Sequence, residues 1–578
     1  MMSFTPAPEF TTRPTLTGRF GMSASTHWLA TASAQSVLEQ GGNAFDAVVA
    51  GAFVLHVVEP HLNGPGGDMV GIFATAGGAP TVLMGQGPAP AGASAAAYRE
   101  LGLELVPGAG ALAAAIPGAV DAWLLLLRDH GTWELPEVLQ FAIGYARHGH
   151  PVLDRVTATI EKMREHFEDH WPSSAALWGS YDGTMPELAG TYERLAASSG
   201  SSRVKRIDAA RMQWSEGFVA QAIDDFVRVP HRHSDGHDYA GVLTARDLAG
   251  FSASFESPVT IDFRGHTIAK SAAWGQGPAL LQMLAILDGF GDIDPSTPLG
   301  AHTILEVEKL ALADRDAWFG DTGDVPLETL LSGTYVSGRR LLVGDRASRE
   351  LRPGSIAGRT PFRPPLTTGT SGMGEPTVSR QGVTRGDTCH IDVIDRWGNI
   401  VSATPSGGWL QSSPAIPGLG FCLGTRLQMT WLQDGAPATL TPGRRPRTTL
   451  TPTLVLREGR AVTALGSPGG DQQDTWQLLY LLRTIVGGYT PQQAIDAPAY
   501  HTTSFPDSFW PRQWEPGGAV VEDRLGATVI DSLESRGHVV TRAGDWALGR
   551  LSAVGTDDRG MLWSAANARG NQGYAAGR

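Results

Sequence analysis

A threonine at the start of a strand-like segment carries the most suggestive chemistry in this chain. Residues 386–395 read Gly-Asp-Thr-Cys-His-Ile-Asp-Val-Ile-Asp, and the alternation of Ile391 and Val393 with polar neighbours predicts a strand. If the chain were cut before Thr388, the new α-amine would lie beside the threonine hydroxyl. That amine could act as general base to its own side chain, the arrangement of an N-terminal threonine nucleophile. Threonine also favours strands because of its branched shape, so the motif needs support from the rest of the chain.

The two cysteines offer an alternative nucleophile. Cys389 directly follows Thr388, and Cys422 is the only other cysteine in 578 residues. We favour a buried structural role for Cys389, because a small thiol packs like an apolar side chain. Two cysteines do not make a disulfide framework, and we expect a reducing, cytoplasmic compartment.

The composition indicates an ordinary globular protein whose length alone allows up to about four domains. Hydrophobic residues make up 42% and charged residues 18%, with a net charge of −13. This acidic balance argues against nucleic acid or an anionic membrane as a partner. We see no secretory signal at the N-terminus and no apolar window long enough to span a membrane.

The first part of the chain predicts two helices, a glycine-rich loop and a strand. The helices are expected at about 31–40 and 44–58, and the second is apolar nearly all round, which is typical of a buried helix. The loop at 63–68 lacks the Lys-Ser/Thr ending of a phosphate-binding loop. We therefore expect it to allow a close backbone approach ahead of a strand at 69–75.

Residues 110–340 read mostly as helices, the clearest at 303–319. Two groups of histidines could suggest a metal, but neither has the glutamate that a zinc-protease helix places directly after its first histidine. We expect surface or capping roles for them, and no metal or cofactor. The groups are His166 with His170, and His231 with His233 and His237.

A turn-rich stretch at 345–387 is the best candidate for a linker. It divides the chain into residues 1–387 and a strand-rich part, 388–578. In the second part we expect a hairpin at 453–465, the loop Gly-Ser-Pro-Gly-Gly at 466–470 and a final hairpin at 551–566. Helices are expected at 475–486 and from Thr490-Pro491, an N-cap followed by proline.

Seven ordered motifs resemble those of the gamma-glutamyltransferase proenzymes, which are N-terminal-nucleophile hydrolases. The resemblance covers about residues 20–575. The motifs are Gly41 to Ala47, Asn63 to Asp68, Glu308 to Asp321, Gly386 to Asp395, Arg445 to Thr453, Gly466 to Gly470 and Ala494 to Ala499, with Ala499 where the family has arginine.

The resemblance implies an α+β fold, the four-layer αββα sandwich, in which both parts form one domain. It also implies self-cleavage between Asp387 and Thr388, leaving two fragments that stay together as a heterodimer or as (αβ)2. Thr388 would then attack a small amide and form an acyl-enzyme. Gly469 and Gly470 would hold the oxyanion through their N–H groups, which suits a side-chain-free pair. Ser406 falls where the family has a threonine that supports the nucleophile.

The departures from the family concern the groups that bind the glutamyl head. Gln86 stands in a stretch, 84–89, where the family has a carboxylate-binding arginine, and the stretch 424–431 lacks the aspartate that binds the α-amine. Gly408 replaces an asparagine, whereas the paired hydroxyls survive as Thr448 and Thr449. Losing the bidentate arginine removes the strongest carboxylate anchor. Arg426 or Arg447 could replace it.

Three hypotheses follow. The chain could be an amidohydrolase of altered specificity, like the oxamate amidohydrolases or cephalosporin acylases, with Trp274 and Trp409 either lining the pocket or lying in the core. It could be a genuine gamma-glutamyl transferase or glutathione hydrolase. It could also be an unprocessed, inactive member. The retained catalytic groups favour the first two hypotheses.

Overall fold

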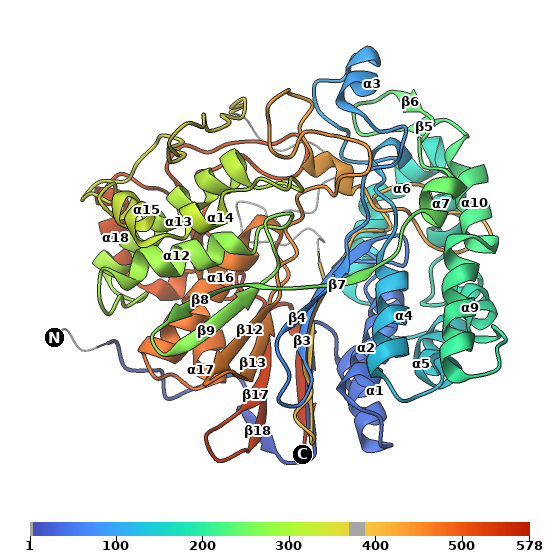
Figure 1. The fold of residues 1–578 in the computed structure, drawn as a ribbon, viewed down its shortest axis with the longest axis horizontal. Coiled ribbons are helices and arrows are strands. Elements are labelled where there is room, and N and C mark those ends of the chain that lie inside the picture. Colours follow the sequence, from blue (N-terminus) through green and yellow to red (C-terminus); the bar gives the residue numbers. More distant parts are fainter. Residues whose placement is uncertain (1–3, 369–387) are drawn as a thin grey trace.

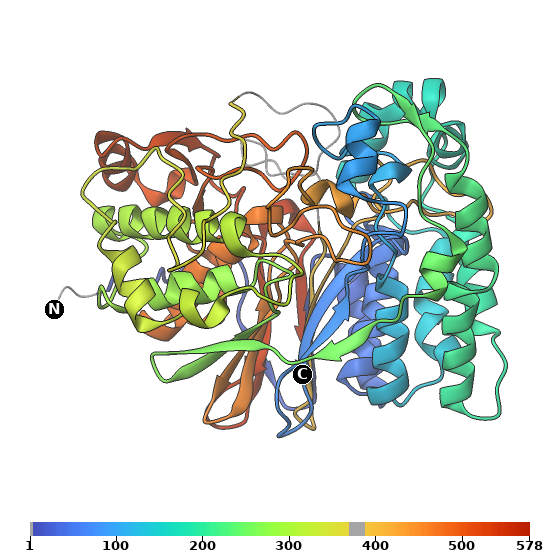
Figure 2. The same cartoon turned by 45° about the horizontal axis from the view of Figure 1, so that its top comes forward.

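The protein is built around two antiparallel sheets that lie face to face. The structure, a computed structural model, describes residues 4–368 and 388–578. Within these residues each sheet has seven strands, and helices cover the outer face of both (Figure 1). The order helix, sheet, sheet, helix confirms the predicted αββα sandwich, and the turned view of Figure 2 shows the same layers.

Both sheets interleave strands from before and after residue 387. The first sheet has the order β1-β18-β17-β13-β12-β9-β8, and the second has the order β19-β2-β10-β11-β3-β4-β7. In the first sheet these strands are β1 (Leu16–Gly18), β18 (Leu562–Ala566), β17 (Ser552–Thr556), β13 (Arg460–Gly466), β12 (Thr453–Arg457), β9 (His266–Lys270) and β8 (Val259–Phe263). In the second they are β19 (Tyr574–Gly577), β2 (Gly21–Ser25), β10 (Ile391–Asp395), β11 (Ile400–Ser406), β3 (Asp68–Ala74), β4 (Thr81–Gly85) and β7 (Ser254–Glu256).

The second sheet is covered by helices from the first half of the chain, on the right of Figure 1. The predicted helix at 44–58 is confirmed, because Asn43 and Asp46 cap its first turn reciprocally. The helix expected at 31–40 begins three residues earlier, since His27 accepts a hydrogen bond from the Leu29 N–H and caps it. The helices of this layer are α1 (Trp28–Glu39), α2 (Ala44–Val58), α4 (Ala119–His130), α5 (Leu135–His148), α6 (Asp154–His170), α7 (Pro172–Trp178), α8 (Pro186–Ala196), α9 (Arg203–Ser215), α10 (Phe218–Val227) and α11 (Ala245–Ala249). Helix α3 (Ala95–Glu100) lies apart, at the top of Figure 1, in a separate apolar cluster.

The first sheet is covered by helices on the left of Figure 1. The helix expected at 303–319 begins at Pro298, after the N-cap Thr297, and its charged residues are buried rather than solvent-exposed. The helix expected at 475–486 is α-helical to Leu481 and continues as one π-helical turn, Leu482–Val486. The helices are α12 (Pro278–Asp288), α13 (Pro298–Trp318), α14 (Leu327–Leu330), α15 (Gly333–Arg340), α16 (Gln473–Leu481), α17 (Pro491–Asp496) and α18 (Ala527–Ser535).

Three apolar cores correspond to the three interfaces between layers. One lies between α2 and the second sheet, one between α12 and the first sheet, and a thinner one between the sheets. Strand β10 borders two of them, with Ile391 and Val393 against the helices and Ile394 between the sheets. The alternation predicted for this strand is therefore confirmed.

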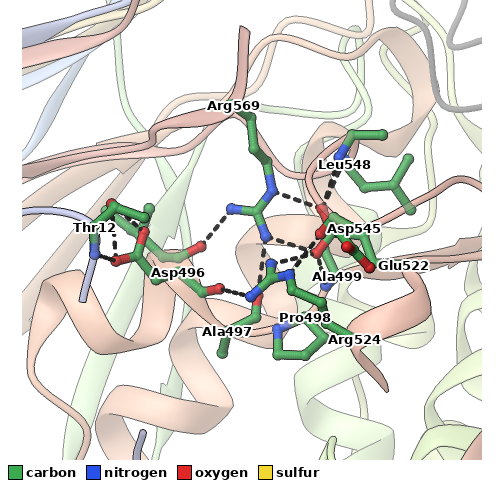
Figure 3. A network of polar contacts seen from close by, with 12 residues as sticks. Thr12, Asp496, Ala497, Pro498, Ala499, Glu522, Arg524, Asp545, Leu548 and Arg569 are labelled. Atoms are coloured by element: carbon green, nitrogen blue, oxygen red, sulfur yellow. Dashed lines mark hydrogen bonds and ion pairs between the residues drawn. The ribbon is translucent and has the colours of Figure 1, made fainter. Parts of the chain in front are cut away.

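The end of α17 is fixed by charged groups that come from elsewhere in the chain (Figure 3). Arg569 and Arg524 both bind the buried carboxylate of Glu522, at 2.8–2.9 Å. Ala499, which stands where the family has arginine, donates its backbone N–H to the same carboxylate at 3.1 Å. The α17 carbonyls Ile495 and Asp496 accept from Arg569 and Arg524, so these guanidinium groups complete the helix end.

Smaller elements complete the fold. The described part of the predicted linker, 345–368, contains isolated β-bridges but no helix or strand, and Thr367 pairs with Gln513. None of the described helices has the length and apolar character needed to cross a membrane. The remaining strands are β14 (Tyr500–Thr502), β15 (Gly518–Val521) and β16 (Val539–Arg542) in one sheet, and β5 (His231–Arg232) with β6 (Asp238–Tyr239) in another.

Candidate active site

Thr388 lies just before β10, at the open end of the β10–β11 hairpin, beside Ser406 at the end of β11. The two residues form an antiparallel β-bridge, and the Thr388 hydroxyl lies 3.3 Å from the Ser406 hydroxyl. The next rung is the bond from the Cys389 N–H to the Pro405 carbonyl, at 2.9 Å. Both hydroxyls are almost fully buried, with 1% of each residue exposed. The predicted nucleophile and its predicted supporting hydroxyl are therefore in contact. Asp387, the other side of the expected cleavage point, lies outside the described residues.

The loop with the glycine pair lies at the same end of the sandwich as Thr388. Ser402 donates to the Leu465 carbonyl across the sheets at 3.0 Å, and the His390 ring packs against Gly466. The end of β13, at Gly466, therefore lies close to the start of β10. Beyond Gly466 the chain reaches the glycine pair, so the loop and the hydroxyl of Thr388 face the same region between the sheets.

Both residues of the glycine pair have positive φ angles, and the position of Gly469 leaves no room for a side chain. Gly469 has φ 130° and Gly470 has φ 53°, and a Cβ on Gly469 would lie 2.2 Å from the Trp476 ring. Gly470 begins a 3₁₀ turn that leads into α16. N–H groups at the start of such a turn are suited to bind negative charge.

Behind this loop, an ion pair joins the two parts of the chain. The ammonium of Lys270, in β9, lies 3.0 Å from the Asp474 carboxylate at the start of α16. It also donates to the Thr451 carbonyl and the Thr453 hydroxyl, at 2.7 and 2.8 Å. Both charged side chains are fully buried, so this pair fixes the helix that follows the glycine pair.

The glycine-rich loop at 63–68 packs against the backbone that follows Ser406. A Cβ on Gly67 would lie 2.1 Å from the Ser406 carbonyl, and one on Gly66 would lie 2.2 Å from the Cys422 carbonyl. The expected close backbone approach is therefore confirmed. Gly408 has φ 66°, and a Cβ there would lie 2.9 Å from the Gly67 N atom. This backbone leaves no room for the asparagine that the family has at this position.

The two candidate cations have different surroundings. Arg426 forms a two-point ion pair with Asp68, with both N–O distances at 2.7 Å, and its guanidinium lies over the Trp409 ring at 5.9 Å. Arg447 donates through one nitrogen to the Ser508 hydroxyl at 2.6 Å. Its Nη1 atom is buried and finds no hydrogen-bond partner in the part of the chain that the structure describes.

Arg447 belongs to a buried charge cluster that begins directly after the glycine pair. The Asp471 carboxylate binds Arg315 and accepts from the Ser508 hydroxyl at 2.5 Å. Burial, with Arg315 nearby, lowers the pKa of Arg447 to about 10, so the group stays charged near neutral pH. Burial and Asp471 hold the pKa of Asp507 well above its usual value.

The other predicted binding residues are buried and lie in loops. Gln86 donates to the Gly87 carbonyl at 3.0 Å, and its own side-chain oxygen finds no partner among the described residues. Thr448 is paired with Gly275 through the backbone, whereas the Thr449 hydroxyl has no partner within the described ranges. Unpartnered buried polar atoms of this kind are candidates for contacts with a ligand.

The tryptophans are part of the framework. Trp274 donates its indole N–H to Glu256 at 2.8 Å and lies under the Arg445 guanidinium. Trp409 is buried against Met429 and Phe509 and donates to the Leu62 carbonyl at 2.7 Å.

Two of the histidines singled out in the sequence have a local structural role. His231 and His233 accept hydrogen bonds from the Ala111 and Leu112 N–H groups and so cap a 3₁₀ turn, as expected for capping residues. Within residues 4–368 and 388–578, one buried group could offer metal ligands, and Lys309 donates to its glutamate at 2.7 Å. A cation already occupies that position, so we assign no metal to it. The group is His302, Glu306 and His538.

Sequence reasoning missed three features of this site. These are the Arg447 cluster, the Lys270–Asp474 pair and the partner of Arg426. Asp471 follows the glycine pair directly in the sequence, and this position could have indicated a charged group close to the site. The other partners are separated by hundreds of residues, and a single sequence contains no signal for them.

Comparisons with known proteins show the family of this chain. The profile of the family described as Gamma-glutamyltranspeptidase matches residues 30–577. The Glutathione hydrolase-like YwrD proenzyme of Bacillus subtilis is 30% identical over 96% of this chain and 98% of its own length. Acylase ACY 1 proenzyme of Pseudomonas sp. (strain SE83) is 29% identical over 95% and 92%.

Two solved structures resemble the whole chain. The structure of LmbA2991HD is 53% identical, with a TM-score of 0.94, and the match covers 98% of this chain and all of that one. The cephalosporin acylase from Bacillus halodurans is 26% identical, with a TM-score of 0.82, and the match covers 100% and 99%.

Proposed function

Because the chain belongs to the gamma-glutamyltranspeptidase family, we propose that it is a self-processing threonine amidohydrolase or acyltransferase. The contact between Thr388 and Ser406, at 3.3 Å, is the observation that carries this proposal. Cleavage between Asp387 and Thr388 gives Thr388 a free α-amine. The two fragments stay together as a heterodimer, because each sheet contains strands from both.

The reaction proceeds through an ester on Thr388. The Thr388 hydroxyl oxygen attacks the amide carbonyl carbon while its proton passes to the α-amine, and Ser406 orients the hydroxyl. The N–H groups of Gly469 and Gly470 stabilise the oxyanion. The amide C–N bond then breaks, and the amine leaves with the proton that the α-amine returns. Water, or a second amine, attacks the ester and restores Thr388.

We further propose that the substrate carries an anionic group that Arg447 binds, in place of the family's arginine anchor. Of the two candidate cations, Arg426 is paired with Asp68 at two points, both at 2.7 Å. Arg447 lies farther from its carboxylate partner, 3.5 Å from Asp316, and its buried Nη1 atom has no hydrogen-bond partner among the described residues. Thr449 adds a hydroxyl without a partner among the described residues. A small amide with a carboxylate in its acyl group, such as a glutaryl amide, suits these groups.

A glutathione hydrolase is the second candidate, favoured by the name of the YwrD relative. Two features count against it. The space for an asparagine at Gly408 is filled by the Gly66–Gly67 backbone, and no aspartate stands in the 424–431 stretch.

A substrate panel tests the specificity. The purified protein is assayed with a gamma-glutamyl anilide, a glutaryl anilide and oxamate, beside the Thr388→Ala variant. We expect Thr388-dependent turnover of the glutaryl amide or oxamate to exceed that of the gamma-glutamyl anilide. Turnover of the gamma-glutamyl anilide alone would refute the altered specificity and favour the glutathione hydrolase.

A further inference from the structure

The residue after the nucleophile is bound by two side chains from the other part of the chain. The Cys389 thiol donates to the Glu59 carboxylate at 3.0 Å and accepts from the Asn63 side-chain amide at 3.1 Å. Cys389 and Glu59 are completely buried, and Asn63 is 1% exposed. Asn63 also pairs with Gly407, just after Ser406. These contacts therefore reach both strands of the hairpin that carries Thr388.

Glu59 is itself held on several sides. It directly follows α2, and its carboxylate accepts from the Thr26 hydroxyl at 2.6 Å and from the Gln572 side chain. The Thr26 N–H in turn donates to the His390 carbonyl at 3.0 Å. Burial raises the pKa of Glu59, and the three donors favour the carboxylate form. The residue is thus a fixed acceptor behind the hairpin.

Cys389 faces away from the reacting groups. Successive side chains of a strand point to opposite faces, and Cys389 packs with Ile391 and Val393 toward the helices. On the other face, His390 binds Asp392 at 2.9 Å between the sheets. Thr388 belongs to that second face, so its hydroxyl and the Cys389 thiol point in opposite directions.

We propose that Cys389 and Glu59 are positioning residues that hold the new amino terminus at Thr388 after cleavage. This inference rests on the proposed self-processing. A free chain end frays unless it is tied down, and cleavage removes the covalent tether on one side of Thr388. Backbone contacts that hold this segment among the described residues include the Thr388–Ser406 bridge and the bond from the Cys389 N–H to the Pro405 carbonyl. The Cys389 thiol adds side-chain hydrogen bonds one residue from the nucleophile, and their partners, Glu59 and Asn63, belong to the 1–387 part.

The test compares three variants with a matched control. Cys389→Ala removes the hydrogen bond between the thiol and Glu59, and Glu59→Gln weakens it. Cys389→Ser keeps a group that can donate and accept. Cys422→Ala is the control, because Cys422 is also a buried free cysteine but lies outside the Glu59–Asn63–Cys389 contacts. Cleavage is followed by intact mass, and kcat and KM are measured on the panel amide that the wild type turns over fastest. A thermal melt checks that each variant is folded.

We expect Cys389→Ala and Glu59→Gln to lower kcat about tenfold or more with little change in KM, because misplacing a reacting group acts on the chemical step. Cys389→Ser is expected to recover most of the loss, and Cys422→Ala to behave as wild type. The double variant Glu59→Gln, Cys389→Ala should be no slower than the slower single variant, since one contact is lost.

Three other outcomes would contradict the positioning role of Cys389. If the wild type is cleaved and active but Cys389→Ala matches Cys422→Ala, the positioning role is wrong and the proposed function stands. If Cys389→Ser is as slow as Cys389→Ala, the hydrogen bond is not the cause and the inference fails. A wild-type chain that stays uncut overturns the proposed function and this inference together.

Discussion

The hydroxyls of Thr388 and Ser406 lie 3.3 Å apart, on two residues whose backbones also pair. The pairing fixes the distance between the side chains, because both hang from the same face of one hairpin. A hydroxyl held in this way needs little reorganisation to act as the nucleophile that we propose.

Removing the supporting hydroxyl should slow the reaction without unfolding the protein. We expect Ser406→Ala to lower kcat about tenfold, the kinetic equivalent of a hydrogen bond worth about 1.4 kcal/mol. Ser406→Thr keeps the hydroxyl and should retain most of the activity. Steady-state kinetics measure kcat for both variants. Equal kcat values for Ser406→Ala and wild type would show that the Ser406 hydroxyl does not support the nucleophile.

The glycine pair should not tolerate a side chain. In Gly469→Ala the new Cβ would meet the Trp476 ring at 2.2 Å, on a backbone with φ 130°. The loop must shift, and loss of an oxyanion donor costs about 10²–10³ in kcat. Gly560→Ala is the control, because Gly560 also has a positive φ, 74°, but nothing lies within 4 Å of its Cβ position. Similar kcat values for the two variants would contradict the oxyanion role.

Arg447 should affect binding of one class of substrate only. We expect Arg447→Gln to raise KM about tenfold for a carboxylate-bearing amide, since a charge-assisted bond is lost. The KM for an amide with an uncharged acyl group should stay unchanged. The comparison uses one leaving group throughout, and an equal rise for both substrates would mean that Arg447 acts on the fold and not on the anion.

Arg426 should be important for stability. Its removal in Arg426→Met leaves Asp68 buried without its two-point partner, and breaking such a pair costs about 3–5 kcal/mol. Arg164→Met is the matched control, because its partner Glu161 is exposed and the pair should matter little. Thermal melts of both variants give the comparison, and an unchanged Tm for Arg426→Met would contradict the structural role.

The buried histidines should make the fold sensitive to acid. Burial lowers the pKa of His501 from the usual 6.5 to about 3, so the unfolded chain binds a proton that the folded chain does not. The stability that this contributes is complete above pH 6.5 and is lost as the pH falls toward 3. His501→Leu should therefore reduce the drop in Tm between pH 7 and pH 5. His237→Leu, at an exposed position, serves as control and should leave the drop unchanged.

Much of this site could be predicted from the sequence, because its chemistry lies in contiguous motifs. Thr388, Ser406 and the Gly469–Gly470 pair stand close to strand ends that local alternation identifies. The helix at 44–58 follows from its cap and its apolar run. Local rules suffice for these features, since the residues that determine them are neighbours in the chain.

The rest depends on partners that are distant in the sequence. Arg426 is paired with Asp68, 358 residues away, so its charge could not be known to be neutralised. The charged residues of α13 resemble those of a solvent-exposed face until the fold supplies buried partners such as Asp471 for Arg315. The contact of Cys389 with Glu59 joins the two parts of the chain in the same way.

The intact mass of the purified protein, beside that of Thr388→Ala, tests the central claim most directly. We predict that the wild type gives two fragments, residues 1–387 and 388–578, the second with threonine at its amino terminus. Thr388→Ala should give one uncut chain without activity. A wild-type chain of full length, or a cleaved and active Thr388→Ala variant, would contradict the assignment of Thr388 as the nucleophile.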